Sequence, residues 1–130
     1  MEIELAFRKE SSRFHWASGC PSHCDSSTSP RAQLFYVDSG ADITLIPKSV
    51  GDLLGLTLAS PQEIREIKGI GERGVPIVIR RLQLQVGSKV FPARVGWCLL
   101  EEVPLLLGRL DCFRLFEISF RYDLATAFKS

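Results

Sequence analysis

The sequence lacks the excess of one charge sign that would favour a nucleic-acid or membrane partner. Its 16 Lys and Arg residues are balanced by 15 Asp and Glu residues, which leaves a formal net charge of +1 at pH 7. Without a basic excess, the chain has no general attraction to phosphate backbones or to anionic lipid. We therefore expect neither a nucleic acid nor a membrane as its main partner.

Long apolar runs are also absent. No segment approaches the roughly 18 consecutive apolar residues that a membrane helix needs. The first residues, Met1 to Glu4, are acidic and lack an uninterrupted apolar core, so they do not match a secretory signal peptide. A cytoplasmic location is therefore predicted. In that compartment the four cysteines are expected to be thiols, namely Cys20, Cys24, Cys98 and Cys112.

The chain shows no internal repeat and no second domain, and its 130 residues suit a single domain with a core of its own, over residues 1–130. Residues 9–33 are polar and rich in Ser and Pro, so a long loop is predicted there. Short helices are predicted over 48–54 and 109–115. Apolar and alternating runs predict strands over residues 3–8, 34–37, 43–46, 75–86, 89–97, 103–107 and 118–122. The predicted fold class is mostly β with two short helices.

Residues 62–86 are typical of a β-hairpin with a glycine-rich tip. Within them, Gly69 to Gly74 also matches the G-x-G-x-x-G pattern of dinucleotide sites. Such a site needs a helix after the glycines, so that the pyrophosphate meets the helix N-terminus. Here a β-rich segment with a proline, Val75 to Ile79, follows instead. We therefore interpret the glycines as freedom for a hairpin that opens and closes, and we expect no cofactor.

The first candidate site element is the segment from Phe35 to Asp42, Phe-Tyr-Val-Asp-Ser-Gly-Ala-Asp. An Asp-Ser-Gly turn is common by itself. In this segment, however, an apolar strand runs directly into Asp38, and a second apolar run begins at Ile43. A carboxylate at the tip of such a loop is placed between buried strands, where loss of water changes its chemistry.

The second element is Leu105-Leu106-Leu107-Gly108-Arg109. An arginine directly after an apolar strand needs a partner, and Asp42 is the natural one. A bidentate pair between Arg109 and Asp42 would lock the two loops together.

Taken together, Val-Asp-Ser-Gly-Ala-Asp and Leu-Leu-Gly-Arg resemble the retropepsin family of aspartic proteases, including its cellular and bacterial members. The order also matches: an acid loop, a glycine-tipped hairpin, then two apolar residues with Gly-Arg before a helix. The resemblance spans about residues 34–122. It implies a closed β-barrel of the acid-protease type, with one or two short helices and a flap hairpin.

The resemblance also implies a role for each site residue. Asp38 would be the catalytic aspartate, Ser39 would brace two loops across a dimer, and Gly40 would leave its carbonyl free for the substrate backbone. Asp42 would hold Arg109 and contact the peptide main chain. The substrate-binding positions that it implies, which include the flap tip and a side-chain pocket, are Ala41, Lys68, Gly69, Ile70, Gly71 and Leu106.

Catalysis of this kind needs two aspartates that share a proton. The chain has one Asp-Ser-Gly, so the resemblance implies a homodimer with Asp38 near its axis, acting as an aspartic endopeptidase on a peptide or protein substrate. The alternative is a catalytically inactive dimerisation or peptide-binding module of the same fold. It arises because residues 9–33 lack the regular hairpin that precedes the catalytic strand in the family.

Another cluster combines Cys20-Pro21-Ser22-His23-Cys24 with His15 upstream. Two thiolates and two imidazoles are zinc ligands, but no second Cys or His pair follows at zinc-finger distance. A loop with free thiols is the alternative, and we favour it, so no metal is expected. A cysteine nucleophile paired with His23 would lack a third group to orient it. Trp97 is predicted in the core or in an interface, and Cys98 and Cys112 are predicted to be buried.

Overall fold

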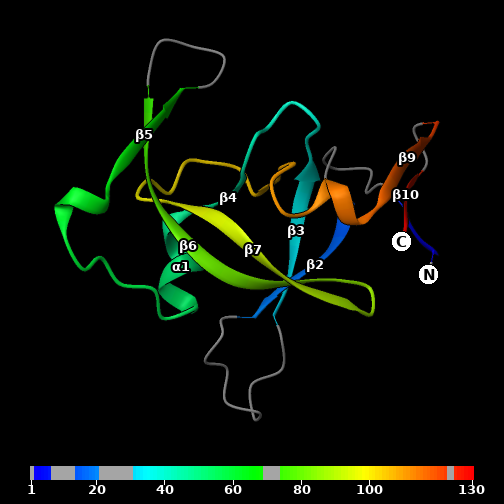
Figure 1. The fold of residues 1–130 in the computed structure, drawn as a ribbon, viewed down its shortest axis with the longest axis horizontal. Helices are drawn as coiled ribbons and strands as arrows, with labels where there is room; N and C mark the ends of the chain where they lie inside the picture. Colours follow the sequence, from blue (N-terminus) through cyan, green and yellow to red (C-terminus); the bar gives the residue numbers. More distant parts are fainter. Residues whose placement is uncertain (1, 7–13, 21–30, 69–73, 123–124) are drawn as a thin grey trace.

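The computed structural model describes residues 2–6, 14–20, 31–68, 74–122 and 125–130, with side chains from Phe35 onward (Figure 1). The described residues contain one α-helix, α1 (Lys48–Leu53), and two 3-10 turns, η1 (Pro61–Glu63) and η2 (Phe113–Leu115). The described strands are β1 (Glu2–Ala6), β2 (Phe14–Cys20), β3 (Arg31–Val37), β4 (Thr44–Ile46), β5 (Arg65–Lys68), β6 (Gly74–Val86), β7 (Lys89–Cys98), β8 (Leu106–Leu107), β9 (Glu117–Arg121) and β10 (Ala125–Lys129).

The larger sheet has seven strands in the order β2-β3-β8-β4-β7-β6-β5. Strand β2 also pairs with β6, so the strands from β2 to β6 form a closed ring and β5 extends beyond it. The predicted class, mostly β with a closed barrel, is confirmed. Strands β5 and β6 form the predicted hairpin, in which Lys68 pairs with Gly74. No helix in the described part of the chain is long and apolar enough to cross a membrane.

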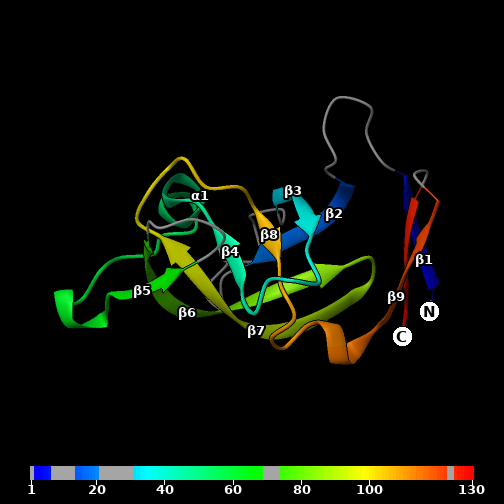
Figure 2. The ribbon, with the colours of Figure 1, turned by 90° about the horizontal axis from the view of Figure 1, so that it is seen from above.

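A second, smaller sheet carries both chain termini at one end of the molecule (Figures 1 and 2). Its three antiparallel strands have the order β1-β10-β9. Three rings connect it to the barrel core. Phe116 packs edge-to-face on Phe91 of β7, with ring centroids 5.8 Å apart, and on Phe128 of β10, at 5.6 Å. Aromatic pairs of this geometry add to the energy of apolar burial.

The core lies inside the barrel, between β6, β7 and the ends of the other strands. Trp97 and the thiols of Cys98 and Cys112 are buried there, as predicted. Burial raises the pKa of Cys98 to about 11 and that of Cys112 to about 12, because a thiolate is poorly solvated in an apolar interior. Both thiols therefore stay protonated at neutral pH.

Helix α1 contains a glycine for a packing reason. Gly51 is buried, and a Cβ built there would lie 2.1 Å from Nε1 of Trp97. The indole N–H donates to the carbonyl of Lys48, 3.2 Å away. The predicted helix is confirmed and ends before Gly55, which has a φ of 77°. Leu53 is 59% exposed, because the helix packs on the barrel core through Gly51, Val50 and Leu54 instead.

Three predictions of local structure were wrong. Residues 14–20 form strand β2 and not a loop, because pairing with β3 and β6 satisfies their backbone groups. Residues 109–115 form turns and a single 3-10 turn, because Asp111 has a φ of 62°, which no α-helix allows. The strand predicted over 103–107 is limited to β8, Leu106–Leu107. The strand predicted over 118–122 does form, as β9, and it ends before Tyr122, which has a positive φ of 55°.

Candidate active site

Asp38 directly follows strand β3, where β8 lies between β3 and β4. Leu106 pairs with Tyr36 in parallel and with Leu45 in antiparallel orientation. The backbone N–H of Asp38 donates to the carbonyl of Leu107 at 3.0 Å, which extends the β3–β8 ladder by one more bond. The apolar strands thus place Asp38 at the edge of the barrel, where it is half-buried.

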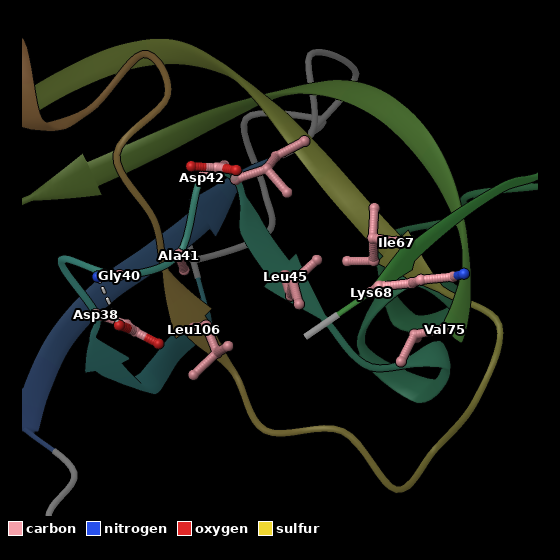
Figure 3. Close-up of a pocket in the computed structure, with 10 residues that line it drawn as sticks. Asp38, Gly40, Ala41, Asp42, Leu45, Ile67, Lys68, Val75 and Leu106 are labelled. Atoms are coloured by element: carbon pink, nitrogen blue, oxygen red, sulfur yellow. Dashed lines mark hydrogen bonds between the residues drawn. The ribbon is translucent and has the colours of Figure 1, made fainter. Parts of the chain in front are cut away.

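The loop after Asp38 is shaped by its own hydrogen bonds (Figure 3). Oδ1 of Asp38 accepts a bond of 2.9 Å from the backbone N–H of Gly40. The N–H of Ala41 donates to the Asp38 carbonyl at 3.2 Å. The second carboxylate oxygen, Oδ2, makes no hydrogen bond with the described residues. Ser39 is exposed on the same loop.

The segment after β8 docks on this loop through consecutive backbone amides. Each of these N–H groups donates to an oxygen of the segment 41–44, and the bonds are Gly108 to Oγ1 of Thr44 at 3.0 Å, Arg109 to the carbonyl of Ala41 at 2.9 Å, and Leu110 to the carbonyl of Asp42 at 2.9 Å. Hydrogen bonds between two loops, made by rigid backbone groups, fix the position of both.

Thr44 and Gly108 form the buried part of this junction. The Thr44 side chain is fully buried, and its hydroxyl accepts the Gly108 bond out of contact with solvent. A Cβ at Gly108 would lie 2.4 Å from the carbonyl carbon of Ile43. Only glycine allows so close an approach of the two backbones. Thr44 was not predicted as a site residue, because it lies in a segment whose other residues, Ile43, Leu45 and Ile46, are all apolar.

An ion pair joins Nη2 of Arg109 to Oδ1 of Asp42, the partners that the sequence suggested. The contact involves one guanidinium nitrogen and not the bidentate pair that was expected. The Arg109 and Asp42 side chains are 54% and 87% exposed. Pairs so open to water contribute little to stability. The backbone amides, rather than this ion pair, therefore hold the two segments together.

A stronger charge cluster follows two residues later. The carboxylate of Asp111 accepts bonds from the backbone N–H of Arg94 at 3.0 Å and from its guanidinium Nε and Nη2 at 2.8 and 3.0 Å. Arg114 donates a further bond at 3.1 Å. These bonds hold the pKa of Asp111 well below its usual range, because they favour the charged form. Asp111 thereby fastens the segment after Gly108 to β7.

A cleft of about 440 Å³ opens beside Asp38. Figure 3 shows the acid loop with Asp38 and Asp42 on one side and residues of the β5–β6 hairpin on the other. The lining residues are Asp38, Gly40, Ala41, Asp42, Ile43, Leu45, Ile67, Lys68, Val75 and Leu106. The cleft joins an apolar wall to a carboxylate, so it offers a bound molecule both apolar contacts and a polar group.

The structure brings most of the predicted site residues to this cleft. Asp38, Gly40, Ala41, Asp42, Lys68 and Leu106 line it. Four further apolar residues line the cleft and were not predicted from the sequence, namely Ile43, Leu45, Ile67 and Val75. Alternation would place Ile43 and Leu45 on one face of their segment. The predicted flap-tip residues Gly69, Ile70 and Gly71 lie outside the described residues.

The competing ligand sites lie partly outside the described residues. After the G-x-G-x-x-G segment comes strand β6 and not a helix, so the glycines do not precede a helix N-terminus. The segment 21–24 and the side chains of His15 and Cys20 lie outside what the structure describes. Among the residues that it does describe, no three His, Cys, Asp or Glu side chains come together as metal ligands.

We compared the sequence and the structure with those of known proteins. No protein-family model and no curated protein matches the sequence. The structure is similar to the crystal structure of a retropepsin-like aspartic protease from Rickettsia conorii, with a TM-score of 0.66 and 18% sequence identity. The match covers 99% of this chain and 91% of that chain. The chain therefore has the retropepsin-like fold that its two motifs predicted.

Proposed function

We propose that the protein is an aspartic endopeptidase in which Asp38 from each of two identical chains activates a water molecule. The observation that carries this proposal is the half-buried Asp38 carboxylate, one oxygen of which is fixed by Gly40, at the edge of an apolar cleft. The retropepsin-like fold around it supports the same chemistry, since the similar protein from Rickettsia conorii is described as an aspartic protease.

The reaction explains the need for two chains. An amide carbonyl reacts slowly with water unless one group removes a proton from the water while another protonates or polarises the carbonyl oxygen. Two neighbouring carboxylates that share one proton supply both roles. The other carboxylate of the described cleft, Asp42, is already ion-paired with Arg109. The second acid is therefore expected from a second copy of Asp38.

The cleft also suggests how a substrate is held. Its walls are apolar between the acid loop and the β5–β6 hairpin, with Ile67 and Val75 facing Leu106 and Leu45 (Figure 3). An extended peptide would place alternate side chains against these walls and use backbone hydrogen bonds along its length. We therefore expect cleavage of unfolded or loop segments with apolar residues near the scissile bond.

The first test is Asp38→Asn. The substitution retains the size of the side chain and the oxygen that accepts the Gly40 bond, but it removes the acid. Hydrolysis of a peptide library should be lost while thermal unfolding is little changed. Cleavage by the wild type should also be faster at mildly acidic pH than at pH 8, because the pair must hold a proton. Undiminished cleavage by the variant would refute the proposal.

Mixing the two chains tests whether the acids are shared. Wild type and Asp38→Asn, unfolded and refolded together in equal amounts, should retain about one quarter of the activity of the same total amount of wild type, because only one pair in four then has two acids. A chain that works alone would retain about half. Peptide binding without any cleavage by the wild type would favour the inactive binding module.

A further inference from the structure

Three arginines gather beside the paired strands β6 and β7, and we call them the basic patch: Arg81, Arg94 and Arg114. Arg81 on β6 pairs with Arg94 on β7. The backbone N–H of Arg94 donates to Asp111 and not to β6, so the two arginines form a non-hydrogen-bonded pair, in which facing side chains lie closest. Like charges placed directly opposite each other destabilise a sheet. The stability of the sheet therefore does not explain this pair.

The charge of the basic patch is only partly balanced. Asp111 accepts bonds from Nη2 of both Arg94 and Arg114 on its Oδ1, at 3.0 and 3.1 Å. Arg81 is exposed and makes no hydrogen bond or ion pair with the described residues. The Arg94 and Arg114 side chains are 49% and 71% exposed. Three positive groups and one carboxylate give a net charge of +2 at the surface, with guanidinium N–H groups left to bind an anion.

The basic patch lies on the same face of the sheet as the cleft. Leu45, which lines the cleft, pairs with Gly96 of β7, and a Cβ on Gly96 would point at the Leu45 side chain, 2.8 Å from its Cδ2. Side chains two residues apart on a strand share a face, so Arg94 lies on the cleft face of β7. Ile79 also pairs with Gly96, is 40% exposed, and is two residues from Arg81. An apolar surface therefore connects the cleft with the patch.

We propose that the basic patch binds an acidic segment of the substrate, several residues away from the scissile bond. The inference rests on the proposed function, since it names the kind of peptide that the cleft receives. The net positive charge favours acidic side chains, and continuity with the cleft favours a peptide over other anions.

The sheet order sets the distance between the patch and the reacting bond. Strand β3, which leads to Asp38, and strand β7 are three strand spacings apart, or about 14 Å. An extended peptide covers that distance in about four or five residues. A homodimer presents the patch twice, because its two-fold axis repeats every surface. An acidic segment on either side of the scissile bond therefore reaches one copy.

The experiment compares two peptides that share one apolar centre. The first carries Asp and Glu residues at both ends, about five positions from the scissile bond, and the second carries Asn and Gln there. The wild type should cleave the acidic peptide with about tenfold higher kcat/KM at low salt, mainly through a lower KM, since several exposed ion pairs form at once. Salt at about 0.5 M should remove most of this advantage.

Variants assign the preference to the patch. Arg81→Gln should lose most of it, and Arg81→Glu should favour a matched peptide with Lys at both ends. Neither variant should unfold at a lower temperature, because each removes a like-charge pair. The matched control is Lys48→Gln, which removes one positive charge over the opposite face of β7, where Lys48 lies 5.9 Å from the centroid of the Trp97 ring. It should retain the wild-type preference.

Binding of the same peptides to Asp38→Asn, measured by fluorescence anisotropy, separates this inference from the proposed function. Tighter binding of the acidic peptide that depends on Arg81, with no cleavage by the wild type, would support the patch and refute the endopeptidase. Cleavage with equal kcat/KM for the two peptides, or a preference that Arg81→Glu leaves unchanged, would overturn the patch alone. Tighter binding of an oligonucleotide of equal charge would also overturn it, because the occupant would then be a nucleic acid.

Discussion

Replacing Thr44 with valine tests how the two segments of the candidate active site are joined. Valine has nearly the shape of threonine but cannot accept the 3.0 Å hydrogen bond from Gly108. The Gly108 N–H would remain buried without a partner, because the backbone of Ile43 packs closely against this glycine. A buried donor without a partner costs about 1 to 3 kcal/mol. We expect the free energy of unfolding to fall by that amount.

The assay is urea unfolding at pH 7, with Thr44→Ser as the matched control. Serine keeps the acceptor and removes only one methyl group, which costs about 1 kcal/mol. The serine variant should therefore be more stable than the valine variant. Hydrogen exchange at the Gly108 amide reports the same bond locally, and its protection should fall in the valine variant only. A valine variant as stable as the wild type, with protected Gly108, would refute the reasoning.

The remaining predictions concern the packing of α1 and the Asp111 cluster. Gly51→Ala should lower the unfolding temperature. Overpacking against Trp97 costs about 1 to 3 kcal/mol, which outweighs the roughly 1 kcal/mol by which alanine stabilises a helix relative to glycine. A stabilised variant would contradict this. Asp111→Asn, which tolerates the positive φ, should lose about 1 to 3 kcal/mol at pH 7 with the charge-assisted bonds from Arg94. Because the folded pKa of Asp111 is lowered, its stabilisation is present above the ordinary aspartate pKa of about 4 and is lost as pH falls toward the folded value. The difference in unfolding free energy between wild type and variant should therefore shrink below about pH 4, and a constant difference from pH 7 to pH 2 would show that ionisation is not the cause.

The barrel strands could be predicted because their signal is local. Strands β6 and β7 alternate buried and exposed residues around a tight turn, in which Gly87 has a φ of 59°. The segments 43–46 and 103–107, which include β4 and β8, are short and mostly apolar, and they end at Pro47 and Gly108. These features depend on neighbours in the chain, and they were sufficient to predict a mostly β fold.

The elements that were missed depend on distant partners. Strand β2 lies in a polar segment and is a strand because β3 and β6 pair with it on both sides. Residues 109–115 have helical spacing, but Arg94 on β7 binds Asp111 in a conformation that breaks a helix. Strand β10 is too short and too rich in small residues to show a clear period. Local sequence pattern therefore predicts the strands with clear alternation or apolar runs, and it does not predict β2, β10 and the segment 109–115.

The residues of the candidate site also fall into those that local sequence pattern predicts and those that it does not. Asp38 and Arg109 stand out because charged residues directly follow apolar strands, and both lie where the sequence placed them. The ion pair of Arg109 is nevertheless exposed, whereas Gly108 and Thr44 meet in the interior, where a lost hydrogen bond or an added side chain cannot be compensated by water. In the Leu-Leu-Gly-Arg motif, the glycine is thus the residue that the fold requires most strictly. The arginine is the more visible signal, but its side chain makes only the exposed ion pair with Asp42.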